Sequence, residues 1–278
     1  MTNRDLSILG VFAHPDDEGS IGGCLAKYAT EGARVYVACA TRGDGVDAQI
    51  KDPSLATRDT LGRVRSHELA CACEKLGIQP PLFLGYQDGE VDQVRVEEAA
   101  RKVARLMREL KSSVVVTHGP EGGYGHPDHL AVSAFTTRAF GLASDPQAEL
   151  GPPPFAPAKL YYTAIPRSFM EKVPSFRERR ADIRGEKLGF VGVEDEKITT
   201  EVDIRAWMRV KLDALSCHRT QFEFDPETRQ PKTFAFSVPE EQRLEMFGHE
   251  RFVLAQASTA RSTAALNGKE ADLFAGIR

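Results

Sequence analysis

Five apolar segments of strand length, separated by longer segments with helical periodicity, constrain the fold more than any other feature of this sequence. The five segments are 6–13, 34–41, 81–86, 112–119 and 159–166. Each is a continuous apolar run, which is typical of parallel strands that are covered on both faces. The intervening segments, roughly 18–31, 57–77, 94–111 and 127–143, are expected to be helices. The sequence therefore predicts an open α/β fold with a mostly parallel sheet and helices on both faces.

The alternation of strands and helices fades after residue 166. The clearest later helix is predicted over 203–219, and short extended segments such as 251–257 follow it. We expect residues 1–166 to form the core and residues 167–278 to form a C-terminal elaboration packed on it, within a single domain. With 41% hydrophobic residues in 278, the chain can bury a core of that size.

Charge and cysteine content exclude several functional classes. The net charge is −4 and acids and bases are interspersed, which argues against a nucleic-acid partner. The one basic run, 175–184, is expected to be a surface helix without a partner. The five cysteines include no CxxC pair, which favours reduced thiols in a cytoplasmic protein. The first apolar run has eight residues and no basic region before it, so we predict no signal peptide and no membrane span.

Polar residues follow the predicted strands where an open α/β sheet binds its ligands. The segment His14-Pro15-Asp16-Asp17 follows the first strand, and His126-Pro127-Asp128-His129 follows the fourth. In each segment, proline pushes the preceding histidine out of the helical region and suits the first position of a helix. Each histidine then ends an extended segment where a helix begins. We therefore expect the two segments to converge on one point.

The residues at this point fit a catalytic metal site. His14, Asp17 and His129 supply two imidazoles and one carboxylate, and three protein ligands with an open position describe a catalytic rather than a structural zinc site. Asp16 stays free beside the ligands, where a carboxylate next to metal-bound water is positioned as a general base. The cofactor expected is Zn²⁺, although this ligand set also accepts Fe²⁺. The glycine-rich segment "GGYG" does not match GxGxxG, so a dinucleotide site is not expected.

These segments resemble the PIG-L/LmbE-like family of zinc-dependent N-deacetylases. The resemblance is carried by "AHPDDE" at 13–18 and "GPEGGYGHPDH" at 119–129, with weaker similarity over most of 6–221 and none that we can name beyond it. It implies a Rossmann-like sheet and removal of the acetyl group from an N-acetylglucosamine-type substrate, an amino-sugar. By position, the resemblance implies the following roles: metal ligands His14, Asp17 and His129, general base Asp16, intermediate-stabilising His126 and mobile Tyr124.

Further roles are expected around this centre. In its cationic form, His126 would stabilise the developing oxyanion, and Asp128 would hold or tune that imidazole. Family resemblance favours Arg65 and Asp88 as partners of sugar hydroxyls, and Asp44 is expected at the same rim. His218, on the predicted helix 203–219, is expected to close the pocket. We expect the remaining histidines to have structural roles, namely His67, His118 and His249.

Three alternative functions are compatible with the same residues. The first is an amidase that acts on thiol S-conjugates or another N-acyl amide with the same machinery. The second is a non-haem iron oxygenase, because two histidines and one carboxylate also form its facial triad. The third is a non-catalytic sugar- or nucleotide-binding module. The sequence leaves open the sugar, the acyl group, the native metal and whether the chain forms a homo-oligomer.

Overall fold

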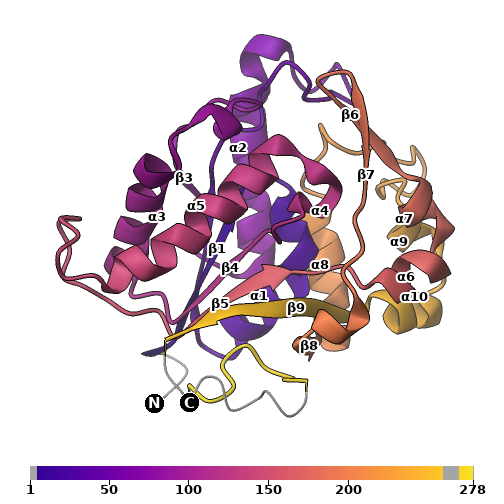
Figure 1. Cartoon of the computed structure of the whole chain (residues 1–278). Helices are drawn as coiled ribbons and strands as arrows, with labels where there is room; N and C mark the ends of the chain where they lie inside the picture. Colours follow the sequence, from indigo (N-terminus) through magenta and orange to yellow (C-terminus); the bar gives the residue numbers. More distant parts are fainter. Residues whose placement is uncertain (1–4, 259–268, 278) are drawn as a thin grey trace.

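A seven-stranded sheet forms the centre of the computed structural model, which describes residues 5–258 and 269–277 (Figure 1). The strand order is β3-β2-β1-β4-β5-β9-β8. The strands are β1 (Ser7–Phe12), β2 (Arg34–Cys39), β3 (Leu82–Phe83), β4 (Val114–Thr117), β5 (Lys159–Thr163), β8 (Thr200–Asp203) and β9 (His249–Ala257). The first five are parallel, whereas β9 runs antiparallel to both β5 and β8. The predicted mostly parallel sheet is confirmed.

Helices cover both faces of the sheet, as predicted (Figure 1). The main helices are α1 (Gly22–Thr30), α2 (Leu61–Leu76), α3 (Val96–Leu110), α5 (Pro127–Ser144) and α8 (Met208–Leu215). Neighbouring residues of β1 point to opposite faces. Ile8 packs in one apolar cluster with residues of α1, α2 and α8, and Leu9 packs in another with residues of α3 and α5. The all-apolar character of β1 therefore follows from its burial on both sides.

Four predicted elements are shorter than expected. The third strand shrinks to the two residues of β3, which lies at the edge of the sheet. The predicted helices at 18–31 and 57–77 begin as 3-10 turns before α1 and α2. The predicted helix at 203–219 contains a 3-10 turn (Arg205–Trp207) followed by α8, and its first residue, Asp203, ends β8. Local periodicity alone located these elements but not their ends.

The expectation of a surface helix over 175–184 is wrong. The basic run starts in the short helix α7 (Pro174–Glu178) and continues into a hairpin of β6 (Arg180–Ile183) and β7 (Glu186–Gly189). The two-residue turn consists of Arg184 and Gly185, with φ of 55° and 80°, as hairpin turns of this length require. The hairpin lies beside α4 (Gly122–Gly125), near the carboxyl end of β4 (Figure 1). The remaining short helices are α6 (Arg167–Lys172), α9 (Phe234–Ser237) and α10 (Glu240–Phe247).

Residues from the C-terminal part complete the sheet and tie it together. Beside β5, the buried side chains of Lys159 and Glu270 form an ion pair. Glu270 also accepts hydrogen bonds from Tyr161 and from Thr200, the latter at 3.1 Å. Because an unpaired buried charge is costly, these contacts fix the segment around residue 270 against β5 and β8.

The cysteines differ from the expectation of five reduced thiols. Cys71 of α2 and Cys217, just after α8, are joined in a disulfide, while Cys24, Cys39 and Cys73 are free and buried. The cysteine-based argument for a cytoplasmic location therefore no longer applies, and that location stays a prediction. Within residues 5–258 and 269–277, no helix is both long and apolar enough to cross a membrane.

The strand order places the two His-Pro-Asp segments together. β1 and β4 are neighbours, and the chain order of the sheet reverses between them. This reversal is the topological switch point, outside the carboxyl ends of the strands, where open α/β sheets bind ligands. His14 follows the end of β1, and His126 precedes the first residue of α5. The predicted convergence of these segments on one point is confirmed.

Candidate active site

Three side chains from the two segments face one another closely enough to share a cation. Nδ1 of His14 lies 3.3 Å from Nε2 of His129. The carboxylate of Asp17 lies 3.4 Å from that Nε2 and 3.6 Å from Nδ1 of His14. Tetrahedral zinc with bonds of about 2.0–2.1 Å separates its ligand atoms by roughly 3.3–3.4 Å. The 3.3 Å between the two ring nitrogens fits this spacing, and the Asp17 carboxylate approaches one nitrogen with each of its two oxygens.

The hydrogen bonds of both imidazoles direct a lone pair toward this point. Nδ1 of His129 lies 3.1 Å from the carbonyl oxygen of Gly122, which assigns the proton to Nδ1 and leaves Nε2 free. Nε2 of His14 lies 2.9 Å from Asp88 and 3.3 Å from Asp128, which assigns its proton to Nε2. The His129 ring is thus in the tautomer that a metal ligand requires, and the His14 ring takes that tautomer once Nδ1 has lost its proton.

Burial and neighbouring charges shift the pKa values of His14, Asp17 and His129. Burial raises the pKa of Asp17, but three surrounding histidines outweigh it and hold the pKa well below its usual range. Burial lowers the pKa of His129, which keeps that ring neutral. Burial also lowers the pKa of His14, but Asp128, Asp88 and Asp17 outweigh it and raise that pKa to about 10. A cation entering the site therefore displaces a proton from His14.

The carboxylate of Asp128 contacts His14 rather than His126, the histidine predicted as its partner. Its fully buried carboxylate lies beside Nε2 of His14 and accepts from the backbone N–H groups of Gly89 and Val91, at 2.8 and 3.2 Å. The contact with His126 is made by the backbone N–H of Asp128, which donates to Nδ1 of that ring at 3.1 Å. The Asp128 carboxylate therefore does not hold His126 by a hydrogen bond, although its charge tunes that ring by raising its pKa against burial and the charge of His14.

A second group of metal-ligand types includes His14, His126 and Asp128. It is not an independent site. The ring nitrogen of His14 that faces Asp128 is Nε2. That atom carries the proton when Nδ1 is directed at the first group, so it has no lone pair to offer a second cation. The first group, with Asp17 and His129, keeps all its lone pairs directed inward and is the better candidate.

His118, which the sequence analysis treated as structural, belongs to the site. It directly follows β4, and its ring stacks on His129 with centroids 4.0 Å apart. Nε2 of His118 lies 3.4 Å from Asp17 and accepts the backbone N–H of Ala13 at 3.3 Å. Its position directly after an apolar strand was the available signal, since ligands lie at the carboxyl ends of parallel strands.

Asp16 stands beside the three ligands with a partly exposed side chain. Arg65 of α2 lies 3.4 Å from its carboxylate and also donates to the backbone oxygens of Pro15 and Gly43. Burial raises the pKa of Asp16 to about 6, against the opposing charge of Arg65. A carboxylate with a pKa in this range can take and return a proton near neutral pH.

His126 and Tyr124 flank the same point. Burial and the charge of His14 lower the pKa of His126 to about 4, so the cationic form assumed in the sequence analysis is disfavoured. Because Nδ1 accepts the N–H of Asp128, the neutral ring carries its proton on Nε2 and remains a donor. Tyr124 packs edge-on against His126 and His129 with centroids 5.7 and 5.1 Å apart. The residues on both sides of it, Gly123 and Gly125, have positive φ.

The four residues expected to bind substrate occupy different places. Asp44 is half-buried at the rim, next to Gly62 at the start of α2. Arg65 is a buried residue that donates to the backbone oxygen of Pro15. Asp88 accepts from Gly45 and contacts His14. His218 is fully buried with Nε2 2.6 Å from Glu18, a residue that the sequence analysis left without a role. Asp44 is therefore the least buried of the four.

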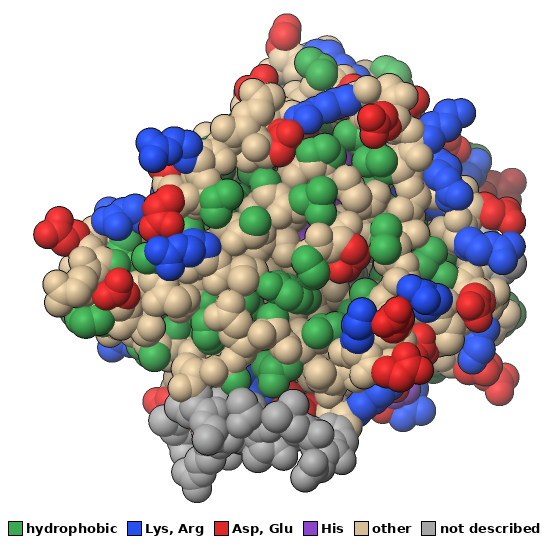
Figure 2. All heavy atoms as spheres, in the orientation of Figure 1, with side chains coloured by type: hydrophobic (Ala, Val, Ile, Leu, Met, Phe, Trp, Pro, Cys, Tyr) green, Lys and Arg blue, Asp and Glu red, His purple; other side chains and the backbone are tan. Residues whose placement is uncertain are grey.

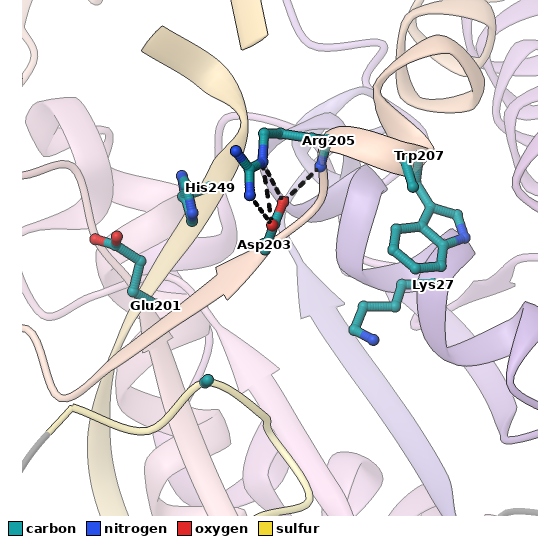
Figure 3. Close-up of a pocket in the computed structure, with 8 residues that line it drawn as sticks. Lys27, Glu201, Asp203, Arg205, Trp207 and His249 are labelled. Carbon is teal, nitrogen blue, oxygen red and sulfur yellow. Dashed lines mark hydrogen bonds and ion pairs between the residues drawn. The ribbon is translucent and has the colours of Figure 1, made fainter. Parts of the chain in front are cut away.

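The molecular surface agrees with this burial. Figure 2 shows charged side chains around the margin of one face, with histidine barely visible. A separate surface pocket is formed by residues of α1, β8 and the start of β9 (Figure 3). There Asp203 pairs with Arg205, and Lys27 lies 4.9 Å from the Trp207 ring. The charges that line this pocket thus have partners within the chain, and we assign it no function.

Comparisons with known proteins agree with one another. The family model PIG-L, described as GlcNAc-PI de-N-acetylase, matches residues 9–140. The chain is 36% identical to the 1D-myo-inositol 2-acetamido-2-deoxy-alpha-D-glucopyranoside deacetylase of Thermomonospora curvata, over 100% of this chain and 99% of that relative.

Solved structures share the fold. The N,N'-diacetylchitobiose deacetylase of Pyrococcus horikoshii aligns with a TM-score of 0.63 and 20% identity, covering 89% of this chain and 83% of that one. The 4-carboxy-2-hydroxymuconate hydratase of Pseudomonas putida aligns with a TM-score of 0.61 and 15% identity, over 92% and 98%. Since proteins named for different reactions share this fold, the architecture alone does not specify the chemistry.

Proposed function

The chain belongs to the PIG-L family of de-N-acetylases, and we propose that it hydrolyses the acetamido group of an N-acetylglucosamine linked to inositol. The substrate class follows the relative that matches over its whole length. The observation that carries the proposal is the set of 3.3–3.6 Å separations among His14, Asp17 and His129. The 3.3 Å between the two ring nitrogens is close to the spacing of ligand atoms on tetrahedral zinc.

In this proposal, His14, Asp17 and His129 hold a zinc ion. When bound, a divalent cation supplies a Lewis acid and lowers the pKa of water from about 15.7 toward roughly 7. Asp16 takes the proton of the attacking water, because its carboxylate lies beside the three ligands and keeps a partly exposed side chain. The same carboxylate then returns that proton to the amine that leaves.

The charge that develops on the acetyl oxygen needs a donor. We assign this role to Nε2–H of His126, because Nδ1 is occupied by the N–H of Asp128. The donor is neutral, because burial is the largest cause that lowers the pKa of this ring. Tyr124, with its glycine neighbours and its ring against His126, is assigned a second hydrogen bond to the same intermediate.

The experiment uses the purified zinc-loaded protein and a panel of N-acetyl substrates with a fluorogenic amine assay. The panel contains inositol-linked N-acetylglucosamine, free N-acetylglucosamine, N,N'-diacetylchitobiose and an N-acyl thiol S-conjugate. We expect amine release to be fastest from the inositol-linked sugar and to be lost in Asp16→Asn, with zinc still bound. Faster cleavage of the S-conjugate would favour the amidase alternative, and an Asp16→Asn variant with wild-type rates would refute the assignment of the base.

A further inference from the structure

The proposed base occupies a backbone conformation that its residue type rarely adopts. Asp16 has φ of 105° and ψ of −22°, in the left-handed region that favours glycine. Residues persist in such conformations only when the surrounding structure holds them there. The residues that hold Asp16 therefore bear on where its carboxylate points.

Glu18 makes the hydrogen bond that holds the Asp16 backbone. The N–H of Asp16 donates to Oε2 of Glu18 at 2.9 Å, and the other oxygen of Glu18 lies 2.6 Å from Nε2 of His218. Glu18 is 1% exposed and His218 is fully buried. A carboxylate this deeply buried is costly unless it is paired, so His218 stabilises the group that constrains Asp16.

His218 cannot serve the substrate from this place. One ring nitrogen faces Glu18, and Nδ1 is buried without a hydrogen-bond partner among the described residues. Its segment is fixed to α2, where Glu68 accepts from the N–H and the hydroxyl of Thr220, both at 2.7 Å. The ring is thus clamped between α2 and the Asp16 loop.

Asp16 is therefore held by two contacts, one on its carboxylate and one on its backbone N–H. Arg65 approaches the Asp16 carboxylate at 3.4 Å, and Glu18 holds the Asp16 backbone. Arg65 and Glu68, which anchor these two arms, lie one turn apart on α2.

We propose that Glu18 and His218 form a positioning pair, which keeps Asp16 in its left-handed conformation with the carboxylate directed at the attacking water. Neither residue touches substrate. The pair acts from the backbone side, and His218 comes from outside the segment 9–140 that matches the family model. This inference rests on the proposed function, because it takes Asp16 as the base.

The test compares Glu18→Ala with a matched control, Glu250→Ala. Glu250 is also a buried glutamate that accepts two backbone N–H groups, those of Gly23 and Cys24, and it pairs with Lys211 rather than with a residue that holds Asp16. Displacing a catalytic group by about 1 Å can cost about 10²-fold in rate. We expect kcat to fall 10- to 100-fold in Glu18→Ala, with KM and zinc affinity within threefold of wild type. Glu250→Ala should lower Tm by about as much as Glu18→Ala does, while its kcat stays within twofold of wild type.

Further measurements separate positioning from general structural damage. Glu18→Gln keeps an acceptor for the Asp16 N–H and should restore kcat to within fivefold of wild type. In an Asp16→Asn background, Glu18→Ala should cost less than twofold, because residues that act as a unit are not additive. A crystal structure of metal-free Glu18→Ala should show Asp16 with negative φ. If Glu18→Ala does not fold, His218→Gln is measured instead, with about tenfold expected.

The outcomes distinguish failure of the positioning pair from failure of the proposed function. If Glu18→Ala slows the reaction no more than Glu250→Ala, or still slows it tenfold in the Asp16→Asn background, the positioning pair is refuted while the base assignment stands. If Asp16→Asn alone keeps wild-type kcat, the proposed function fails before the pair is at issue.

Discussion

Two carboxylates share one proton of a metal ligand, and their removal singly and together should have very different effects. Nε2 of His14 lies 2.9 Å from Asp88 and 3.3 Å from Asp128. Either carboxylate alone can accept that proton and keep Nδ1 directed at the cation. We therefore expect Asp88→Ala and Asp128→Ala each to weaken zinc binding by less than about tenfold, the low end of the range for outer partners of metal-bound histidine.

The double variant removes both acceptors, so the preferred tautomer of His14 is lost. We expect zinc affinity to fall at least about 100-fold, which is more than the product of two small single effects and corresponds to roughly 2.7 kcal/mol. Stability should separate the two residues. Asp128→Ala leaves the backbone N–H groups of Gly89 and Val91 without their acceptor, at a cost of about 1–3 kcal/mol each. Asp88→Ala leaves one, that of Gly45.

Zinc affinity is measured by competition with a chromophoric chelator at constant pH, and stability by urea unfolding of the metal-free proteins. Far-UV circular dichroism shows whether each variant keeps the wild-type secondary structure. A double variant that binds zinc within threefold of wild type would show that these carboxylates do not orient His14. An Asp128→Ala variant as stable as Asp88→Ala would contradict the hydrogen-bond assignment.

Three further predictions concern pH, the C-terminal network and the hairpin. Burial raises the pKa of Asp16 to about 6, and a base works only when ionised, so kcat should fall as pH drops through 6. Bound metal favours the ionised form, which makes 6 an upper bound, and a midpoint above 7 would contradict the assignment. Lys159→Met leaves the buried Glu270 without its ion-pair partner and should lower the free energy of unfolding in urea by about 3–5 kcal/mol. Arg138→Ala, at the exposed pair with Glu97, should lower it by under about 1 kcal/mol. Equal losses of stability in the two variants would contradict this expectation. Arg184 donates hydrogen bonds to the carboxylate of Asp92 and the backbone oxygen of Gly89. Arg184→Ala should therefore free the β6–β7 hairpin and raise KM several-fold. An unchanged KM would show that the hairpin does not border the substrate.

The central strands and the clustering of the candidate metal ligands could be predicted because their signals are local. A strand buried on both faces must be apolar throughout, and His-Pro-Asp segments after two such strands place their side chains at one edge of the sheet. His14, Asp17 and His129 are accordingly brought together. The β6–β7 hairpin was missed because its arginines resemble an exposed helix, although the Arg184-Gly185 turn was a signal for it.

Contacts between distant parts of the chain could not be predicted in the same way. Nothing near Glu18 indicates that its partner lies 200 positions later, at His218. The pairing of β9 with β5, and of Asp128 with His14 rather than His126, also depends on tertiary packing. Side chains that support a site from behind are buried like ordinary core residues, so composition and periodicity do not single them out.

The placement of β9 between β5 and β8 has a practical consequence for anyone dissecting this protein. The segment that matches the family model ends at residue 140, before β5 begins. A fragment cut there would leave β4 with a bare edge of unpaired amides and carbonyls, and one cut after β5 would leave the same on β5. Such fragments should self-associate through that edge, so the catalytic half is best expressed with its last hundred residues attached.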